Sequence, residues 1–421
     1  MILAAALGAV GALMAVPVAA QAPTAAQQAR ANAALDAAPV WDGHNDLPFQ
    51  LRLRYRNVIG NFDFNDGTNV PPAGQNANPL QTDAPRLRQG RVGAQFWSVY
   101  VPASMPDPQA VVATIEQIDV TKRLIARYPD ILAFATTADE VEAAMRRGRI
   151  ASLLGAEGGS SIGNSLAVLR QMYDLGVRYL TLAHSRTLDW VDSATDTPRH
   201  GGLNEFGVQV VREMARMGML VDLSHVSEEA MHDAMTAIGA PVIFSHSGAR
   251  AVNGHARNVP DSVLERLPQE GGIVMVVGYP DYLSEVLRQH LAARAAQRAQ
   301  LASLWQGQPQ RAAEELAAWD AANPAPLSTI GEMADHIDHI RRVAGIDHIG
   351  IGGDYDGMPT GPVGMEDVSG YPALFAELAR RGYSRADMEK IASRNMMRVL
   401  REAEAYAASQ RGMAPIETPI N

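Results

Sequence analysis

Eight short apolar runs, alternating with amphipathic stretches, constrain the fold of this chain most strongly. The amphipathic stretches carry apolar residues at helical spacing and lie at 109–127, 165–175, 205–217, 227–238 and 329–343. Strands that alternate with helices indicate parallel pairing, and eight of them favour a closed (β/α)8 TIM barrel over an open sheet. The apolar runs lie at 39–43, 93–99, 150–156, 179–183, 220–224, 242–245, 272–277 and 349–353.

Six of the apolar runs lead directly into a side chain that can bind a metal ion. In a TIM barrel the carboxyl ends of all strands open at one face, where active sites gather. We therefore expect these six side chains to surround one mouth of the barrel, an arrangement that chance would rarely produce. They are His44, Glu157, His184, His225, His246 and Asp354.

The composition narrows the chemistry of such a site. The chain has no cysteine, which excludes disulfides, thiolate zinc sites, iron–sulfur clusters and cysteine nucleophiles. Any metal site must use mainly His, Asp and Glu, and 11 histidines are present. The net charge of −10 argues against a nucleic-acid partner, which would require a basic surface.

The spacing of the candidate ligands predicts two metal sites that share a carboxylate. His44 and Asp46 are two residues apart in an extended segment, so both can reach one ion. His225 and His246 end two consecutive runs and can hold a second ion through imidazole nitrogens. Glu157, flanked by glycines, can bridge the two. Two ions roughly 3.5–4 Å apart would hold a bridging hydroxide, the nucleophile of a hydrolase.

Other potential ligands lie away from the ends of the apolar runs. A carbamylated lysine bridges the metals of some barrel hydrolases, but Lys122 and Lys390, the only lysines, both lie in helical stretches. The remaining histidines are expected to be ordinary structural residues. They are His200, His232, His255, His290, His336, His339 and His348.

Three residues outside the two predicted metal sites are candidates for binding substrate or transferring protons. Asp354 can move a proton from the attacking water to the leaving amine, although direct metal binding is an alternative. His184 is spare in the ligand count and can donate a hydrogen bond to a developing oxyanion. Arg257 can grip a carboxylate with its guanidinium, or it can be an ordinary surface arginine.

The chain of 421 residues exceeds a minimal barrel of about 250 residues. We expect one catalytic domain at 39–405, after a lead-in at 23–38 and before a flexible tail at 406–421. Two insertions, at 47–91 and 280–327, follow the first and seventh runs. They are candidates for lids or substrate walls, and contacts between subunits or packing on the outside of the barrel are equally open.

The first 22 residues resemble a secretory signal peptide, with an apolar, alanine-rich run that ends in small residues. No basic residue precedes Arg30, so the usual positive segment is missing. Cleavage near Gln21 would leave a periplasmic or secreted protein. No later segment approaches the roughly 18 consecutive apolar residues of a membrane span.

Seven ordered motifs resemble those of the membrane dipeptidase (renal dipeptidase) family of binuclear zinc peptidases. The resemblance extends from about residue 41 to residue 400 and favours a soluble bacterial form, because the chain lacks the cysteines and apolar carboxyl-terminal anchor signal of mammalian relatives. The motifs are WDGHNDLP at 41–48, GAEGG at 155–159, YLTLAHS at 179–185, DLSHVS at 222–227, SHS at 245–247, RNVPD at 257–261 and GGDYDG at 352–357.

The resemblance implies a dipeptidase with two Zn²⁺ per chain on a barrel of the metal-dependent hydrolase type. His44, Asp46 and Glu157 would hold one ion, and Glu157, His225 and His246 the other. The resemblance also implies roles for three residues that bind no metal. His184 would contact the tetrahedral intermediate, Arg257 the substrate carboxylate, and Asp354 the water and the substrate amine.

Family members cleave dipeptides, often with a D-residue at the carboxyl side, and some open β-lactams. Relatives are commonly dimers, so a homodimer is expected here. Two alternatives stay open at this point. One is another binuclear amidohydrolase that acts on lactones, cyclic amides or phosphotriesters. The other is a catalytically inactive periplasmic binding protein.

Overall fold

The computed structural model describes residues 22–66 and 79–418. The predicted signal peptide therefore lies, except for its last residue, outside the described residues, as does part of the first predicted insertion. Among the described residues, no helix is both long enough and apolar enough to cross a membrane.

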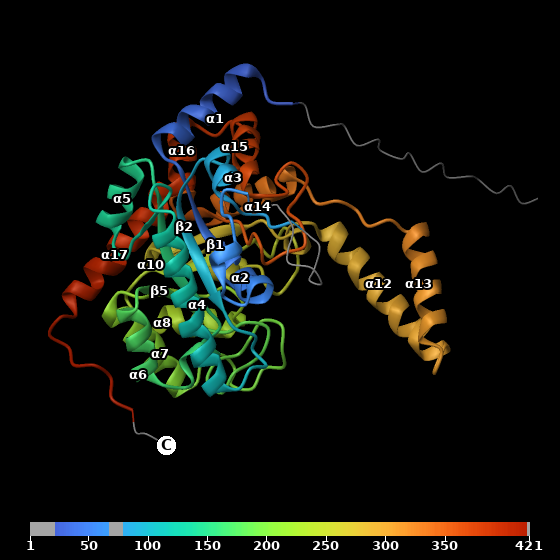
Figure 1. Cartoon of the computed structure of the whole chain (residues 1–421), viewed down its shortest axis with the longest axis horizontal. Coiled ribbons are helices and arrows are strands. Elements are labelled where there is room, and N and C mark those ends of the chain that lie inside the picture. The colour runs from blue at the N-terminus through green and yellow to red at the C-terminus, as the bar shows by residue number, and fades with distance from the viewer. Residues whose placement is uncertain (1–21, 67–78, 419–421) are drawn as a thin grey trace, which may run out of the picture.

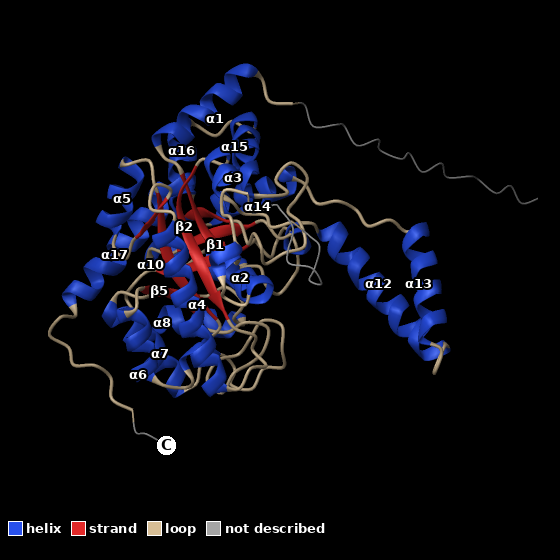
Figure 2. Ribbon diagram, in the orientation of Figure 1, coloured by secondary structure: helices blue, strands red, loops and turns tan. Residues whose placement is uncertain are grey.

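A closed barrel of eight parallel strands forms the centre of the molecule, with helices around it (Figure 2). All eight apolar runs overlap these strands, so the predicted TIM barrel is confirmed. The barrel strands are β1 (Val40–Asn45), β2 (Val92–Tyr100), β4 (Ile150–Glu157), β5 (Val177–Thr181), β6 (Leu220–Asp222), β7 (Val242–Ser247), β8 (Ile273–Val277) and β9 (Ile349–Gly352).

Parallel pairing of β2 with β4 closes the barrel, in a register that places Ala94 opposite Ala151 and Tyr100 opposite Glu157. A short extra strand, β3 (Leu132–Phe134), pairs with the beginning of β4. The sequence analysis did not predict β3, although this strand lies in a short apolar run at 131–135. Since β3 lies at the amino end of β4, it leaves the mouth of the barrel open.

The five amphipathic stretches form α4, α6, α7, α8 and α14, each within two residues of the expected bounds. Capping fixes several starts; for example, Thr329 and Glu332 form a reciprocal capping box at α14. The helices are α1 (Ala25–Ala37), α2 (Leu47–Tyr55), α3 (Ala84–Gln89), α4 (Asp107–Arg127), α5 (Ala138–Arg146), α6 (Leu166–Asp174), α7 (Glu205–Met217), α8 (Glu228–Ala237), α9 (Asp261–Leu264), α10 (Leu267–Glu270), α11 (Pro280–Leu283), α12 (Glu285–Leu304), α13 (Pro309–Ala322), α14 (Ile330–Val343), α15 (Tyr371–Arg380), α16 (Arg385–Glu389) and α17 (Asn395–Ser409).

Large side chains from the barrel strands fill the space beneath the mouth. Trp41, Phe96 and Tyr179 are fully buried in one cluster with Met275. Gly155 makes room for the Tyr179 ring, because a Cβ at this position would lie 2.0 Å from the ring carbon Cζ. Side chains therefore fill the barrel below the mouth. The hydroxyl of Tyr179 extends toward the mouth and lies 2.8 Å from His44 Nδ1.

The two predicted insertions behave differently. The first begins with α2, which lies against β2 and α4. The second begins with α11 and continues as a hairpin of α12 and α13, which extends away from the barrel (Figure 1). Arg294 and Asp320 join the two helices through paired contacts of 2.7 Å.

The two ends of the described chain pack on the barrel. The lead-in forms α1, which packs on α15 and α16. Helix α17 continues to Ser409, beyond the boundary expected at 405. Farther on, the backbone N–H of Ile416 donates to Glu213, and the Ile416 carbonyl accepts from Arg170.

Candidate metal centre

The carboxyl ends of the barrel strands bring the candidate ligands to one place. His44 is the second-last residue of β1, Asp46 follows the strand directly, and Glu157 is the last residue of β4. His246 lies within β7, and His225 follows β6 by three residues. All five are buried, with exposed fractions of at most 7%.

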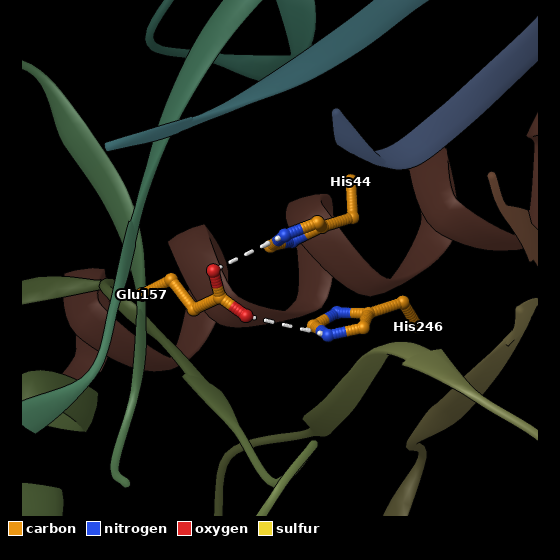
Figure 3. Close-up of side chains that lie close together, drawn as sticks. All are labelled: His44, Glu157 and His246. Atoms are coloured by element: carbon orange, nitrogen blue, oxygen red, sulfur yellow. Dashed lines mark ion pairs between the residues drawn. The ribbon is translucent and has the colours of Figure 1, made fainter. Parts of the chain in front are cut away.

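The three histidines surround the carboxylate of Glu157. One carboxylate oxygen, Oε2, lies 3.5 Å from His44 Nε2. The other, Oε1, lies 3.1 Å from His225 Nε2 and 3.4 Å from His246 Nε2. Figure 3 shows Glu157 between the rings of His44 and His246, which approach it from different strands. Imidazole nitrogens thus lie beside both oxygens of one carboxylate.

Several atoms at this centre need a partner that the described residues do not supply. His44 Nε2 and Asp46 Oδ1 are buried without a hydrogen-bond partner among the described residues. The Nε2 atoms of His225 and His246 face each other at 2.9 Å. Buried polar atoms are costly when unpaired, and neutral imidazole nitrogens with carboxylates are common ligands of divalent metals. The donor set therefore fits metal ions.

The distances between the potential ligand atoms group them differently from the two metal sites predicted from the sequence. Three groups lie within 4.8 Å: His44 with Glu157 and His246, Glu157 with His184 and His225, and His44 with Asp46 and Asp354. The expected pairings thus merge into one continuous cluster. His184 and Asp354, for which roles toward substrate were expected, also lie within ligand distance.

Burial sets the protonation of His225 and His246. It lowers the pKa of both His225 and His246 well below that of an ordinary histidine, with the charge of Arg257 acting in the same direction. Both rings are therefore neutral at physiological pH, which is the form that binds a metal. Burial alone would raise the pKa of Glu157, but the nearby imidazoles, His44 above all, hold it well below its usual value.

Asp354 differs from Glu157 in its electrostatics. Burial raises its pKa well above that of an ordinary aspartate, and the nearby carboxylates of Asp46 and Glu157 add to the effect. Its backbone has a φ of 62°, and that of His225 a φ of 72°, in the left-handed region that non-glycine residues rarely adopt. Backbone strain of this kind persists only where the surrounding structure holds the residue in place, and it is common at functional sites.

A cavity of about 310 Å³ opens onto the cluster. Arg257 reaches it from the loop after β7 and is only 1% exposed, so it is not the surface arginine of the alternative interpretation. Its guanidinium donates to the His246 carbonyl and to Ser247 Oγ, while Nε has no partner among the described residues. The lining comprises Asp46, Phe49, Gln50, Tyr100, Glu157, His184, Ser185, Thr195, His225, His246, Arg257, Tyr279, Tyr282, Asp354, Asp356 and Gly357.

His184 lies at the edge of the cluster and is more accessible than the other histidines there. Its Nε2 is 3.7 Å from Glu157 Oε1, and its side chain is 23% exposed. Burial lowers its pKa, so the ring is neutral and can donate one hydrogen bond. The position suits either contact with a substrate oxygen or metal binding.

Sequence analysis missed the aromatic walls of this cavity. Phe49 from α2 packs edge-on against Tyr100, which packs against His184. On the other side, Tyr282 from the beginning of the second insertion stacks on Tyr279. Each of these residues lies within six positions of a strand end, and that proximity is the signal that could have revealed them.

The remaining histidines occupy places outside the cluster. His336 is buried and joins two loops: Nδ1 accepts from the Ala249 N–H, and Nε2 donates to the Leu283 carbonyl. The His255 ring packs at a tilt against Tyr282. His200 contacts the Leu188 carbonyl, His232 lies beside Arg266, His290 packs against Trp319, His339 contacts Asp261, and His348 contacts the Gly272 carbonyl.

A parallel barrel with a buried His/Asp/Glu cluster at its carboxyl face defines a metal-dependent hydrolase. Comparison with known families identifies the family within this class. Residues 28–413 match the model of the membrane dipeptidase family, peptidase family M19. The chain belongs to this family, and it is a dipeptidase of the metallopeptidase class. The resemblance noted in the sequence is confirmed.

Curated dipeptidases match most of the chain. Dipeptidase tcpJ of Claviceps purpurea (strain 20.1) is 42% identical over 89% of this chain and 79% of its own length. Dipeptidase 3 of Rattus norvegicus is 39% identical over 90% of this chain and 68% of its own length.

Solved structures share the fold. The probable dipeptidase PvdM from Pseudomonas aeruginosa superposes with a TM-score of 0.75 at 23% identity, covering 91% of this chain and 99% of that chain. A metallopeptidase from Rhodobacter sphaeroides, liganded with a phosphinate mimic of the dipeptide L-Ala-D-Ala, gives a TM-score of 0.69 at 24% identity. It covers 87% of this chain and 99% of its own.

Proposed function

We propose that this chain hydrolyses dipeptides at a centre that holds two zinc ions. His44, Asp46 and Glu157 would hold one ion, and Glu157, His225 and His246 the other. The observation that carries the proposal is the convergence of three buried imidazoles on the two oxygens of Glu157, beside the buried Arg257. When bound, the two cations would supply an activated water and polarise the scissile carbonyl.

Arg257 would select substrates that end in a free carboxylate. Its guanidinium is held by the His246 carbonyl and by Ser247, and its Nε still lacks a partner. A planar guanidinium that is fixed in this way can bind a carboxylate through paired hydrogen bonds. Because Arg257 and the cluster line the same small cavity, the distance between them would limit the substrate to about two residues.

His184 and Asp354 would act on the reacting groups. The neutral His184 ring can donate a hydrogen bond to the carbonyl oxygen as negative charge develops on it. Asp354, whose pKa is raised by burial, can hold a proton and pass it to the leaving amine. Asp354 would also accept a hydrogen bond from the free amino group of the substrate.

We further propose that the enzyme accepts a D-residue at the carboxyl side of the dipeptide and opens some β-lactams. The support is the similarity in fold to the metallopeptidase with the bound L-Ala-D-Ala mimic. In both kinds of substrate, an amide carbonyl and a free carboxylate lie close together, which is the pair of groups that the cluster and Arg257 would recognise.

A single panel tests these proposals. The purified protein is stripped with a chelator, reloaded with Zn²⁺, and given L-L, L-D and D-D dipeptides, a tripeptide and one penem. We expect dipeptide hydrolysis that depends on Zn²⁺ and little cleavage of the tripeptide. Hydrolysis that persists in the stripped protein would contradict the metal centre. Hydrolysis of L-L dipeptides alone would restrict the substrate range.

Cellular location and assembly are separate proposals. The apolar run at 1–22 supports a signal peptide and a periplasmic or secreted enzyme. Amino-terminal sequencing of the protein from the producing cell would test it, with a start near Gln21 as the expected result. A homodimer, expected from the family resemblance, would be tested by sedimentation.

A further inference from the structure

A buried carboxylate lies behind the proposed ligand His246. Asp222, the last residue of β6, is fully buried and accepts four hydrogen bonds. Its Oδ1 accepts from the backbone N–H groups of Ser224 at 3.1 Å and Ser245 at 2.8 Å. Its Oδ2 accepts from the hydroxyls of Thr181 at 2.5 Å and Ser245 at 2.6 Å.

These contacts fix the direction of the next hydrogen bond. Ser245 Oγ also lies 2.8 Å from His246 Nδ1. A hydroxyl has one hydrogen, and Ser245 donates that hydrogen to Asp222, since an ionised carboxylate can only accept. Ser245 must therefore accept from His246, so Nδ1 carries the ring hydrogen. The lone pair is then on Nε2, the atom that faces Glu157 at 3.4 Å.

We propose that Asp222 is a positioning residue that acts through Ser245 to keep His246 in the tautomer whose Nε2 can bind metal. This proposal rests on the proposed metal centre. In many metalloproteins a carboxylate contacts the metal-binding histidine directly and orients it. Here a serine hydroxyl lies between the two, and the same carboxylate holds the backbone of β7 through the Ser245 N–H.

The substitution Asp222→Asn separates positioning from packing, because it keeps the size of the side chain and reverses the two hydrogen bonds that link residue 222 to Ser245 and Ser245 to His246. The amide oxygen can still accept from the two backbone N–H groups. The amide nitrogen then donates to Ser245 Oγ, which in turn donates to His246 Nδ1. The ring hydrogen moves to Nε2, and the ring can no longer offer a lone pair to the metal.

Thr181→Val is the matched control. It removes the other hydroxyl from the same carboxylate oxygen while leaving the chain from Asp222 through Ser245 to His246 intact. If Asp222 only stabilised the fold, both substitutions would change thermal stability and neither would change the tautomer of His246.

The test measures the tautomer in the metal-free protein and the affinity for zinc. Protein labelled with ¹⁵N-histidine gives long-range ¹H–¹⁵N spectra in which the two tautomers differ, and His246→Gln assigns the signal of His246. We expect an Nδ1 hydrogen in the wild type and in Thr181→Val, and an Nε2 hydrogen in Asp222→Asn. By chelator competition, Asp222→Asn should bind Zn²⁺ about 10–100-fold more weakly, and Thr181→Val should stay near the wild-type affinity.

An Asp222→Asn protein with an Nδ1 hydrogen and wild-type zinc affinity would overturn the proposal. If Asp222→Asn fails to fold, Ser245→Ala provides the test, because it removes the acceptor of the Nδ1 hydrogen; an unchanged His246 spectrum and zinc affinity would then overturn the proposal. A wild type that binds no Zn²⁺ would instead contradict the metal centre, and the spectrum of the metal-free protein would still decide the tautomer.

Discussion

The guanidinium of Arg257 lies over the ring of Tyr282, with its central carbon 5.2 Å from the ring centre. This cation–π contact, together with hydrogen bonds to the His246 carbonyl and to Ser247 Oγ, holds a buried positive charge at the wall of the cavity. Tyr282 comes from α11, which the second insertion contributes. The insertion thus helps to orient the residue that we assign to the substrate carboxylate.

Replacing Arg257 by Met should weaken binding of substrates with a free carboxylate. A hydrogen bond to a charged group contributes about 1.5–3 kcal/mol, so we expect KM for a dipeptide to rise about 10–100-fold. The matched control is the same dipeptide with an amidated carboxyl end, whose kcat/KM should change little. Equal losses on both substrates would show that Arg257 supports the fold of the site and does not recognise the carboxylate.

The number of bound ions should depend on which carboxylate is removed. Glu157 lies between all three histidines, whereas Asp46 is near His44 only. We therefore expect Glu157→Gln to lose both ions and Asp46→Asn to lose one. Elemental analysis after dialysis measures the metal content per chain. Full metal content in Glu157→Gln would rule out the shared carboxylate.

The substitution His184→Leu, which leaves no hydrogen-bond donor, distinguishes an oxyanion contact from a metal ligand. A lost oxyanion donor lowers kcat about 10²–10³-fold with little change in KM. The metal content should stay that of the wild type. Loss of an ion from this variant would instead assign His184 to the group that it forms with Glu157 and His225.

Asp354→Asn should abolish proton transfer and keep the metal. General acid–base catalysis contributes about 10²–10⁴-fold, and kcat should fall within that range. Bound zinc, measured on the same preparation, distinguishes this role from direct coordination near His44 and Asp46. A variant with wild-type kcat would show that another group transfers the proton.

Acid should destabilise the fold through His336. Burial lowers its pKa to about 4, from 6.5 in an unfolded chain, so between these values only the unfolded state gains a proton. Stability is therefore lost as pH falls from about 6.5 to about 4, by up to about 3 kcal/mol. Urea unfolding at pH 7 and 4.5 should show a smaller acid loss in His336→Gln than in the wild type. Equal losses would assign the effect to other groups.

Much of the fold could be read from short-range patterns. The barrel strands are buried at almost every position and appear as short apolar runs, whereas the amphipathic helices bury one face and show a helical period. The strand β3 and the projection of α12 and α13 away from the barrel could not be predicted. The apolar run at 131–135 does not reveal that its strand pairs with β4 outside the closed barrel. The direction of a hairpin depends on a few contacts at its base.

The sequence by itself determined the barrel, because short apolar runs alternate with amphipathic stretches. It also indicated the family, because the motifs that contain the His, Asp and Glu residues follow one another in the family's order. It also supplied the candidate ligands, His44, Asp46, Glu157, His225 and His246. Only the tertiary structure decided which atoms face one another. It buried Arg257, joined Phe49 and Tyr282 to the cavity, and placed Asp222 behind His246 through Ser245. These relationships depend on distances between separate strands and loops, and no local sequence pattern records such distances.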